Sequence, residues 1–240
     1  MAQFFDPNIT EDQSFAILSE EESKHICKVL RMQSGDSLEL VNGKGMLFYG
    51  TIAIADSRRC KVEITKIVKE EKLNTHIHVA IAPTKNMDRM EWLLEKATEI
   101  GVDEISFLSC DNSERKVLKM ERLSKIVQGA MKQSKRLYLP KINELQSFDQ
   151  FLKSHPSGLI AHCERLEDPL SREDTLANHW KSIDCPILIG PEGDFSTKEI
   201  EKAMHAGYQA IRLGKNRLRT ETAGLYAVMQ AKLLSDEQHF

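Results

Sequence analysis

Strand and helix patterns alternate along residues 76–213, which leaves few folds open to this part of the chain. Short apolar runs typical of buried strands occur at 76–83, 105–108, 158–163, 186–189 and 209–213. Between the first two runs, apolar side chains share one helical face that ends at Gly101. The pattern predicts an α/β fold with a mostly parallel sheet, whose strands end in loops at one shared edge.

One of these strands runs directly into a Gly-Pro-Glu-Gly loop, in the stretch PILIGPEGDFS at 186–196. Ser196 followed by Glu199 predicts a capping box that opens a helix after the loop. Glycines let a backbone approach a ligand closely, and the amides at a helix N-terminus can bind it. The loop is therefore a candidate ligand site. The alternative is a tight connection between strand and helix that binds nothing.

A second loop of this kind follows the last strand, in the stretch IRLGKNRLRTETAG at 211–224. Gly214 is followed there by three cations, Lys215, Arg217 and Arg219, and then by a Thr-Glu-Thr helix start. We expect both loops to face the same sheet edge as 161–164, because all three follow parallel strands. Such a set of loops suits a nucleoside-bearing cofactor that is held mainly by backbone groups.

Other enzyme classes lack their characteristic spacing in this chain. There is no GxxxxGK[ST], HExxH or GxSxG motif, and the Gly43-Lys44-Gly45 stretch lacks the third glycine of a dinucleotide-binding fingerprint. The five cysteines are widely spaced and form no CxxC pair, so we expect buried thiols, no disulfide and no metal site. They are Cys27, Cys60, Cys110, Cys163 and Cys185.

Positive charge is concentrated in one segment, although the whole chain has a net charge of −3. Residues 112–141 contain nine Lys or Arg and two Glu, a local charge of +7. A polyanion could dock on this segment, and the alternative is a solvated helix face. No apolar run approaches the length of a membrane span, and the N-terminal stretch MAQFFDPNITEDQ does not resemble an export signal. We therefore expect a cytoplasmic protein without a membrane partner.

The first seventy residues have a different pattern, which is rich in short strands. A helix is expected over 19–31, with Ser19 and Glu22 as its capping box, and strands are expected at 37–41, 47–55 and 60–68. These strands could form a small barrel. The polar stretch at 69–74 then acts as a linker, so the chain is expected to form two domains, 1–70 and 75–240.

The motifs IGPEGDFS and LGKNRLRTETA together resemble the RsmE family of SPOUT methyltransferases, which modify ribosomal RNA. Further stretches resemble the same family in the same order: HICKVLRMQSGD at 25–36, RMEWLLEKATEIGV at 89–102, SER at 113–115 and KQSKRLYLPKI at 132–142. The resemblance covers nearly the whole chain. It implies an N-terminal PUA-like RNA-binding β-barrel, followed by a SPOUT α/β domain with a C-terminal trefoil knot.

The resemblance also implies a cofactor, S-adenosylmethionine, and two sets of binding residues. The cofactor set is His162, Gly190, Pro191, Glu192, Gly193, Leu213, Gly214, Leu218 and Thr220. The RNA-binding set is Lys28, Arg31, Lys85, Arg89, Arg115, Lys132, Lys135 and Arg136. Taken singly, His162 could equally be a core residue, Arg31 could pin a loop, and the others could be surface charges.

Two positions depart from the family pattern. The family typically reads GPEGGF where this chain has Asp194, so a positive φ there would fall on a residue that tolerates it moderately well. Relatives usually carry a basic residue near the N-terminus where this chain has Gln3. These departures leave open how this chain makes the corresponding cofactor and RNA contacts.

The reaction implied by the resemblance is methylation of N3 of a uridine in the 16S RNA of the small ribosomal subunit, by a homodimer. The N3 imide must lose its proton, so negative charge develops on the uracil ring. Arg219 is the first candidate to stabilise that charge, because preorganised charge is often the largest catalytic contribution. Glu221 could accept a proton or fix Arg219, or it could simply favour the helix start as a carboxylate in the first turn.

The apolar residues after Glu221 predict a long helix that needs a partner surface. They are Ala223, Leu225, Val228, Met229 and Leu233. The partner could lie in the same domain or in a second copy of the chain, and the resemblance favours a second copy. Two other functions stay open: a non-catalytic factor that binds ribosomal RNA during subunit assembly, and a related methyltransferase that acts on transfer RNA.

Overall fold

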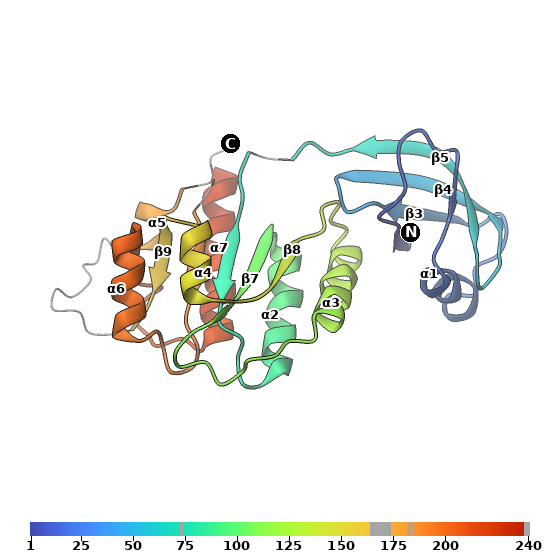
Figure 1. The fold of residues 1–240 in the computed structure, drawn as a ribbon. Coiled ribbons are helices and arrows are strands. Elements are labelled where there is room, and N and C mark those ends of the chain that lie inside the picture. The colour runs from blue at the N-terminus through green and yellow to red at the C-terminus, as the bar shows by residue number, and fades with distance from the viewer. Residues whose placement is uncertain (73, 164–173, 182, 184, 238–240) are drawn as a thin grey trace. The chain divides into compact units, whose positions relative to one another are not determined.

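The computed structural model describes residues 1–240 except 73, 164–173, 182, 184 and 238–240. The chain forms two compact units (Figure 1). The first comprises Met1–Leu73 together with Gln128–Leu139, and the second comprises Asn74–Val127 and Pro140–Phe240. Among the described residues, no helix is both long and apolar enough to cross a membrane.

The first unit is built on a five-stranded sheet in the order β1-β3-β4-β5-β2. Its strands are β1 (Gln3–Phe5), β2 (Phe15–Ile17), β3 (Ser37–Val41), β4 (Met46–Ile54) and β5 (Lys61–Lys69). The three longer strands confirm the predicted ones to within a residue or two at each end. Strands β1 and β2 were not predicted, because three residues are too few to show an alternating pattern.

The predicted helix over 19–31 is wrong in its second half. An α-helix α1 (Glu20–Lys24) is followed by a π-helical turn, η1 (His25–Val29), in which the Leu30 amide donates to the His25 carbonyl. The wider turn accompanies full burial of Ile26 against the barrel core. Arg31 then leaves the turn with a positive φ of 56°.

The predicted capping box of this helix is only half formed. The Ser19 hydroxyl accepts from the Glu22 amide at 3.3 Å. The Glu22 carboxylate, however, accepts from Lys132 Nζ at 2.6 Å and from the Phe5 amide at 3.4 Å. Glu22 therefore joins three segments of the first unit instead of closing its own helix N-terminus.

The second unit is a six-stranded, entirely parallel sheet in the order β11-β9-β10-β6-β7-β8. Its strands are β6 (His78–Ile81), β7 (Glu104–Ser109), β8 (Lys141–Ser147), β9 (Gly158–Ala161), β10 (Ile187–Ile189) and β11 (Tyr208–Ile211). Five of these confirm the predicted strands. Strand β8 was not predicted, because KINELQS lies at the sheet edge and contains mostly polar, partly exposed residues.

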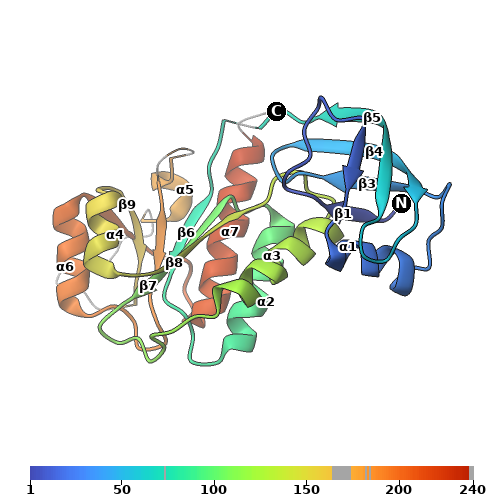
Figure 2. The ribbon, with the colours of Figure 1, turned by 45° about the vertical axis from the view of Figure 1, so that its right-hand side comes forward.

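Helices cover both faces of this sheet (Figure 2). Helix α4 contacts β7, β8 and α6, whereas α7 contacts α2, α5, β6 and β10. The helices of the second unit are α2 (Met87–Ile100), α4 (Phe148–Ser154), α5 (Leu176–His179), α6 (Thr197–Ala206) and α7 (Thr220–Glu237), and α3 (Met120–Gln133) is divided between the two units after Val127. The predicted ending of α2 at Gly101 and the capping box between Ser196 and Glu199 at the start of α6 are both confirmed.

The strand register brings the carboxyl ends of four strands to one level. Ile189 of β10 pairs with Ile81 of β6 and with Ala161 of β9, and Ala161 pairs with Ile211 of β11. The loops that follow these four strands therefore start side by side. This register positions the candidate site.

Candidate active site

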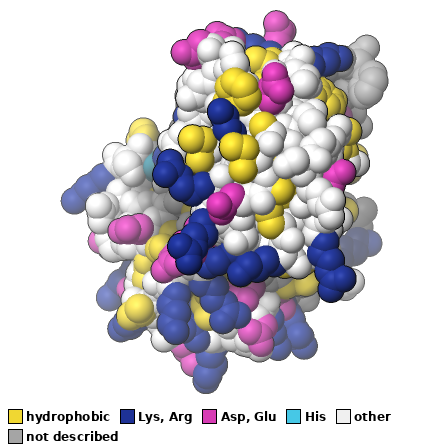
Figure 3. All heavy atoms as spheres, turned by 90° about the vertical axis from the view of Figure 1, so that its right-hand side faces the viewer, with side chains coloured by type: hydrophobic (Ala, Val, Ile, Leu, Met, Phe, Trp, Pro, Cys, Tyr) yellow, Lys and Arg dark blue, Asp and Glu magenta, His cyan; other side chains and the backbone are white. Residues whose placement is uncertain are grey.

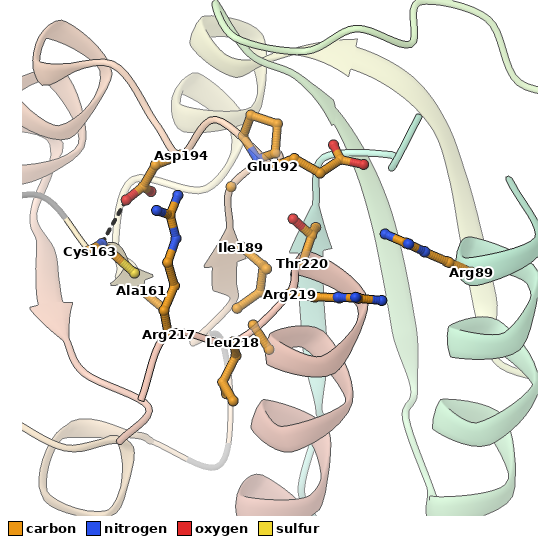
Figure 4. Close-up of a pocket in the computed structure, with 13 residues that line it drawn as sticks. Arg89, Ala161, Cys163, Ile189, Glu192, Asp194, Arg217, Leu218, Arg219 and Thr220 are labelled. Atoms are coloured by element: carbon orange, nitrogen blue, oxygen red, sulfur yellow. Dashed lines mark hydrogen bonds between the residues drawn. The ribbon is translucent and has the colours of Figure 1, made fainter. Parts of the chain in front are cut away.

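Two adjoining cavities lie at the carboxyl ends of the aligned strands. They have volumes of about 300 Å³ and 290 Å³. Both are lined by Ala161, Cys163, Arg217, Leu218 and Ala223. The first extends to the Gly-Pro-Glu-Gly loop and to α2 (Figure 4). The second extends along the loop after β11. The sequence prediction that these loops face one edge is therefore confirmed.

Eight of the nine predicted cofactor-binding residues line these cavities. In the first cavity are Gly190, Pro191, Glu192, Leu218 and Thr220; in the second are His162, Leu213, Gly214 and again Leu218. Gly193 lines neither, and a Cβ atom at this position would lie 3.2 Å from the Asn112 side chain. Glu164, in the loop after β9, lies outside the described residues.

Two glycines in the site have different physical roles. A Cβ atom on Gly190 would lie 3.1 Å from Phe195, so this glycine lets its own loop pack tightly. Gly214 has a φ of 147°, and a Cβ atom there would meet nothing within 4 Å. Gly214 therefore combines an unusual backbone conformation with an unfilled Cβ position in the lining of the second cavity, which is the arrangement expected where a backbone approaches a ligand.

Asp194 adopts the positive φ that the family glycine would allow, with a value of 64°. Its carboxylate accepts from the Phe195 amide at 2.8 Å and from the Cys163 amide at 2.7 Å. The side chain thereby ties the loop after β10 to the loop after β9. Cys163 itself is exposed, so the expectation of buried thiols is wrong at this position. Partial desolvation of its thiol, together with the negative charge of Asp194, raises the pKa of the thiol.

Two arginines meet at one end of the first cavity. Arg219 precedes α7 and Arg89 lies in the first turns of α2, and their side chains extend toward each other (Figure 4). Arg89 was predicted as an RNA contact, so its position in the cavity was missed. The sequence partly indicated this position, because Arg89 follows the predicted strand that became β6, whose carboxyl end lies beside that of β10.

Glu221 is buried beside Arg89. Its Oε1 atom lies 3.8 Å from Arg89 Nε, and its Oε2 atom has no hydrogen-bond partner among the described residues. No ion pair in the described part of the chain joins Glu221 to Arg219. The alternative in which Glu221 fixes Arg219 is therefore corrected, because the carboxylate pairs with Arg89 of the neighbouring helix.

Most of the predicted RNA-binding cations have partners within their own unit. Lys85 pairs with Glu114 at 2.8 Å, Lys132 with Glu22 at 2.6 Å and Lys135 with Glu39 at 2.7 Å. Arg115 donates to backbone carbonyls, and Arg136 is partly exposed in the segment after α3. Figure 3 shows Lys and Arg side chains gathered over part of one face, with Asp and Glu side chains among them.

Lys28 and Arg31 differ from the other cations of this set. Both are in the first unit, at and just after the π-helical turn, and Arg31 is exposed. Among the described residues, neither donates a hydrogen bond or forms an ion pair. These two side chains are therefore free to meet a polyanion without first breaking an internal contact.

Family models match both parts of the chain. Residues 18–65 match a model described as the RNA methyltransferase PUA domain, and residues 70–232 match one described as the RNA methyltransferase domain. The predicted fold class, with a PUA-like unit followed by a SPOUT-type α/β domain, is thereby confirmed. The trefoil knot stays a prediction.

Curated relatives are similar over most of their length. Ribosomal RNA small subunit methyltransferase E 2 of Borreliella burgdorferi is 31% identical, with 89% of this chain and 88% of the relative covered. Ribosomal RNA small subunit methyltransferase E of Buchnera aphidicola subsp. Acyrthosiphon pisum is 32% identical, with 89% and 86% covered.

Solved structures share the whole fold. A probable rRNA methyltransferase from Porphyromonas gingivalis has a TM-score of 0.86 at 39% identity, with 99% of this chain and 100% of that chain covered. A putative methyltransferase from Legionella pneumophila with bound SAM has a TM-score of 0.84 at 28% identity, with 96% of each chain covered. With this similarity along its length and the cavity at its strand ends, the chain belongs to the ribosomal RNA small subunit methyltransferase E (RsmE) family.

Proposed function

We propose that this protein transfers a methyl group from S-adenosylmethionine to N3 of a uridine in the 16S RNA of the small ribosomal subunit. One observation carries the proposal: three loops at aligned strand ends line a cavity that has two arginines at one end. Cofactor loops and a cationic end fit methyl transfer to a nitrogen that becomes anionic. The named relatives support ribosomal RNA as the substrate.

The cavities fit the proposed cofactor in size and in chemistry. Their volumes are near the lower end of the range for small-molecule sites. Apolar side chains of Ala161, Ile189 and Leu218 suit an adenine ring, and Gly214 leaves space for close approach to the backbone. When bound, S-adenosylmethionine supplies an electrophilic methyl group. Structures of the Legionella pneumophila relative and of the Neisseria gonorrhoeae RsmE contain this cofactor.

The two arginines account for the chemistry at the base. As N3 loses its proton, negative charge spreads to the neighbouring carbonyl oxygens, and guanidinium groups placed there stabilise it without reorganising. Arg219 and Arg89 can approach the ring from two elements, and the buried Glu221 carboxylate orients Arg89. The target base must leave its stack to reach this cavity.

RNA binding is assigned first to the free cations of the PUA-like unit. Lys28 and Arg31 can neutralise phosphates directly. Lys132 and Lys135 would first have to give up their ion pairs with carboxylates of the same unit. We propose that the substrate is an assembled or nearly assembled small subunit in the cytoplasm. A homodimeric assembly belongs to the same proposal, as does a domain boundary between residues 70 and 75, to which the segment 128–139 of the first unit is an exception.

Mass mapping of 16S RNA tests the proposal. Small subunits from a strain that lacks the gene should be short of one methyl group on a uridine, and purified protein with S-adenosylmethionine should restore it. Restoration on transfer RNA instead would move the substrate to the alternative class. RNA binding without any methyl transfer would leave only the assembly-factor function.

A further inference from the structure

The loop between β7 and α3 joins two loops of the cofactor cavity. Its residues 111–115, Asp-Asn-Ser-Glu-Arg, are here called the brace segment. They include the Ser-Glu-Arg stretch that the sequence suggested as an RNA contact. None of them lines either cavity, yet their polar groups bond to loops that do.

On one side, the brace segment holds the Gly-Pro-Glu-Gly loop. Asn112 Nδ2 donates to the Gly193 carbonyl at 3.3 Å and to the Asp194 carbonyl at 3.0 Å. The Ser196 hydroxyl donates to the Asp111 carboxylate at 2.6 Å. The loop after β10 is thereby bonded in its middle and at its C-terminal end to the loop after β7.

On the other side, the brace segment holds the connection between β6 and α2. Arg115 Nε donates to the Thr84 carbonyl at 3.3 Å, and its Nη2 donates to the Lys85 carbonyl at 2.6 Å. Glu114 pairs with Lys85 Nζ at 2.8 Å. The Lys85 amide in turn donates to Glu192 Oε1 at 2.9 Å, which closes a ring of bonds through three loops.

This ring fixes the start of α2. Asn86 caps that helix by accepting from the Asp88 amide at 2.9 Å, and Arg89 follows in the first turn. The position of the Thr84 and Lys85 carbonyls therefore determines where Arg89 enters the cavity opposite Arg219. The same bonds hold Glu192 at the cavity wall.

We propose that Arg115 is a positioning residue of the methyl-transfer site, which sets the geometry of Arg89 and Glu192, and is not a ligand of RNA phosphate. The inference rests on the proposed function. Arginine suits this task because its planar fork can donate to two carbonyls in a fixed relation, whereas a lysine supplies one mobile point charge. A phosphate contact, by contrast, depends mainly on positive charge, which a lysine also supplies.

Two substitutions separate these roles: Arg115→Lys keeps the charge and loses the fork, and Arg115→Met loses both. We expect both to lower kcat by roughly ten- to a hundredfold, the scale of small misplacement in an active site, with little change in KM for the subunit. Lys116→Met, which removes a neighbouring exposed charge, is the matched control and should keep kcat. The salt dependence of RNA binding should be the same in Arg115→Met as in the unmodified protein.

Hydrogen exchange of the cofactor-free protein gives a readout that does not depend on catalysis. The Lys85 amide is bonded to Glu192, so peptides covering 83–90 should exchange faster in both Arg115 variants and unchanged in Lys116→Met. Thermal unfolding checks that each variant is folded. If Arg115→Met does not fold, the kinetics and hydrogen exchange of Arg115→Lys alone test the positioning role.

Two results would overturn the inference. One is full activity of Arg115→Lys together with a salt slope for Arg115→Met that falls by about one unit, the signature of a lost phosphate contact. The other is unchanged exchange at 83–90 in both variants. An unmodified protein that methylates no ribosomal RNA would instead refute the proposed function, while the exchange experiment would still test the brace.

Discussion

Arg219 is the side chain on which the proposed chemistry depends most directly. It lines the cavity from the residue just before α7, and its side chain is exposed with no described ion pair. Arg219→Ala should leave the fold and cofactor affinity intact and should lower methyl transfer by about a hundredfold, the scale of removing one preorganised donor. Single-turnover kinetics with calorimetry of cofactor binding measures both. Turnover near the unmodified rate would remove Arg219 from the mechanism.

A second residue-scale prediction concerns His78, which lies buried at the opposite end of β6 from the site. Its Nε2 lies 2.8 Å from the Ser106 hydroxyl, and burial lowers its pKa to about 4. Glu104 faces it together with His76, His155 and Lys141. Burial opposes ionisation of Glu104, but hydrogen bonds from His76, Lys141 and Asn143 hold its pKa well below the usual range.

Both groups make the fold sensitive to acid in the same direction. The unfolded chain binds a proton at His78 near pH 6.5, so folding stability falls on the order of 3 kcal/mol between pH 6.5 and 4 from this residue alone. The Glu104 contribution is present above its unfolded pKa and is lost below it. His78→Gln keeps a hydrogen-bonding side chain but does not titrate, so the loss of folding stability between pH 6.5 and 4 should be smaller in this variant. Denaturant unfolding at several pH values measures it, and an unaltered profile would contradict the assignment.

At the scale of elements, hydrophobic periodicity predicted the inner strands of the parallel sheet and missed the edge strand β8. The buried strands β6, β7, β9 and β10 read as apolar runs because both of their faces are covered. Strand β8 is at an edge, so its sequence carries no such signal. The loops of the cavity were predictable because glycine and capping residues follow the strands directly.

Other parts of the site could not be predicted, because they depend on contacts between distant residues. Arg89 and Glu192 line one cavity although they come from segments far apart in the sequence, which the Lys85 amide joins by its bond to Glu192 Oε1. Charge counting over 112–141 likewise could not show that Lys132 and Lys135 are paired with carboxylates from the N-terminal part of the chain. The π-helical turn at His25–Val29 leaves no mark in the 3.6-residue periodicity of its sequence.

Arg31 and Lys135 both lie in exposed turns with a positive φ, so they allow a matched test of which of the two side chains binds RNA. Arg31 ends the π-helical turn at a φ of 56°, and Lys135 follows α3 at a φ of 59°. Glycine relieves about 1 kcal/mol of backbone strain at such positions. Arg31→Gly should therefore raise the melting temperature and weaken RNA binding, with a salt slope lower by about one unit.

Lys135→Gly is the control, because it relieves the same strain but removes the ion pair with Glu39 and the hydrogen bond to the Met1 carbonyl. We expect no net gain in melting temperature from it. Differential scanning fluorimetry and salt-dependent RNA binding compare the two variants. If Arg31→Gly leaves RNA affinity unaltered, Arg31 serves the turn and not the RNA.

At the scale of the whole molecule, the two units do not follow the order of the sequence. Residues 128–139 complete the first unit, where Met131 and Leu137 pack on Val41 and the Leu139 amide donates to the Gly43 carbonyl. The sequence could not predict this, because the segment lies between strands of the other unit. A fragment ending at residue 70 would therefore lack part of its own core.

The exposed side of α7 is the surface on which two copies of the chain are proposed to pair. Val228 is buried in its own unit, so part of the apolar pattern is satisfied within the chain. Tyr226, Met229 and Leu233 are spaced along one side of the helix and are 39%, 45% and 62% exposed. Burying a fully exposed apolar side chain contributes roughly 1.5–3 kcal/mol, and these side chains, which are already about half buried, would contribute about half of that each. This surface is the proposed contact of the homodimer.

A double substitution, Met229→Glu with Leu233→Glu, tests that contact. Two carboxylates buried without partners cost several kcal/mol, so the variant should be monomeric at micromolar concentration in light scattering. Met204→Glu, at an equally exposed methionine on α6, is the matched control and should keep the mass of the unmodified protein. Because α7 begins at the cavity residue Thr220, loss of the second copy should also lower cofactor affinity. A monomeric variant with full affinity and turnover would show that each chain carries a complete site, and a monomeric unmodified protein would refute the dimer.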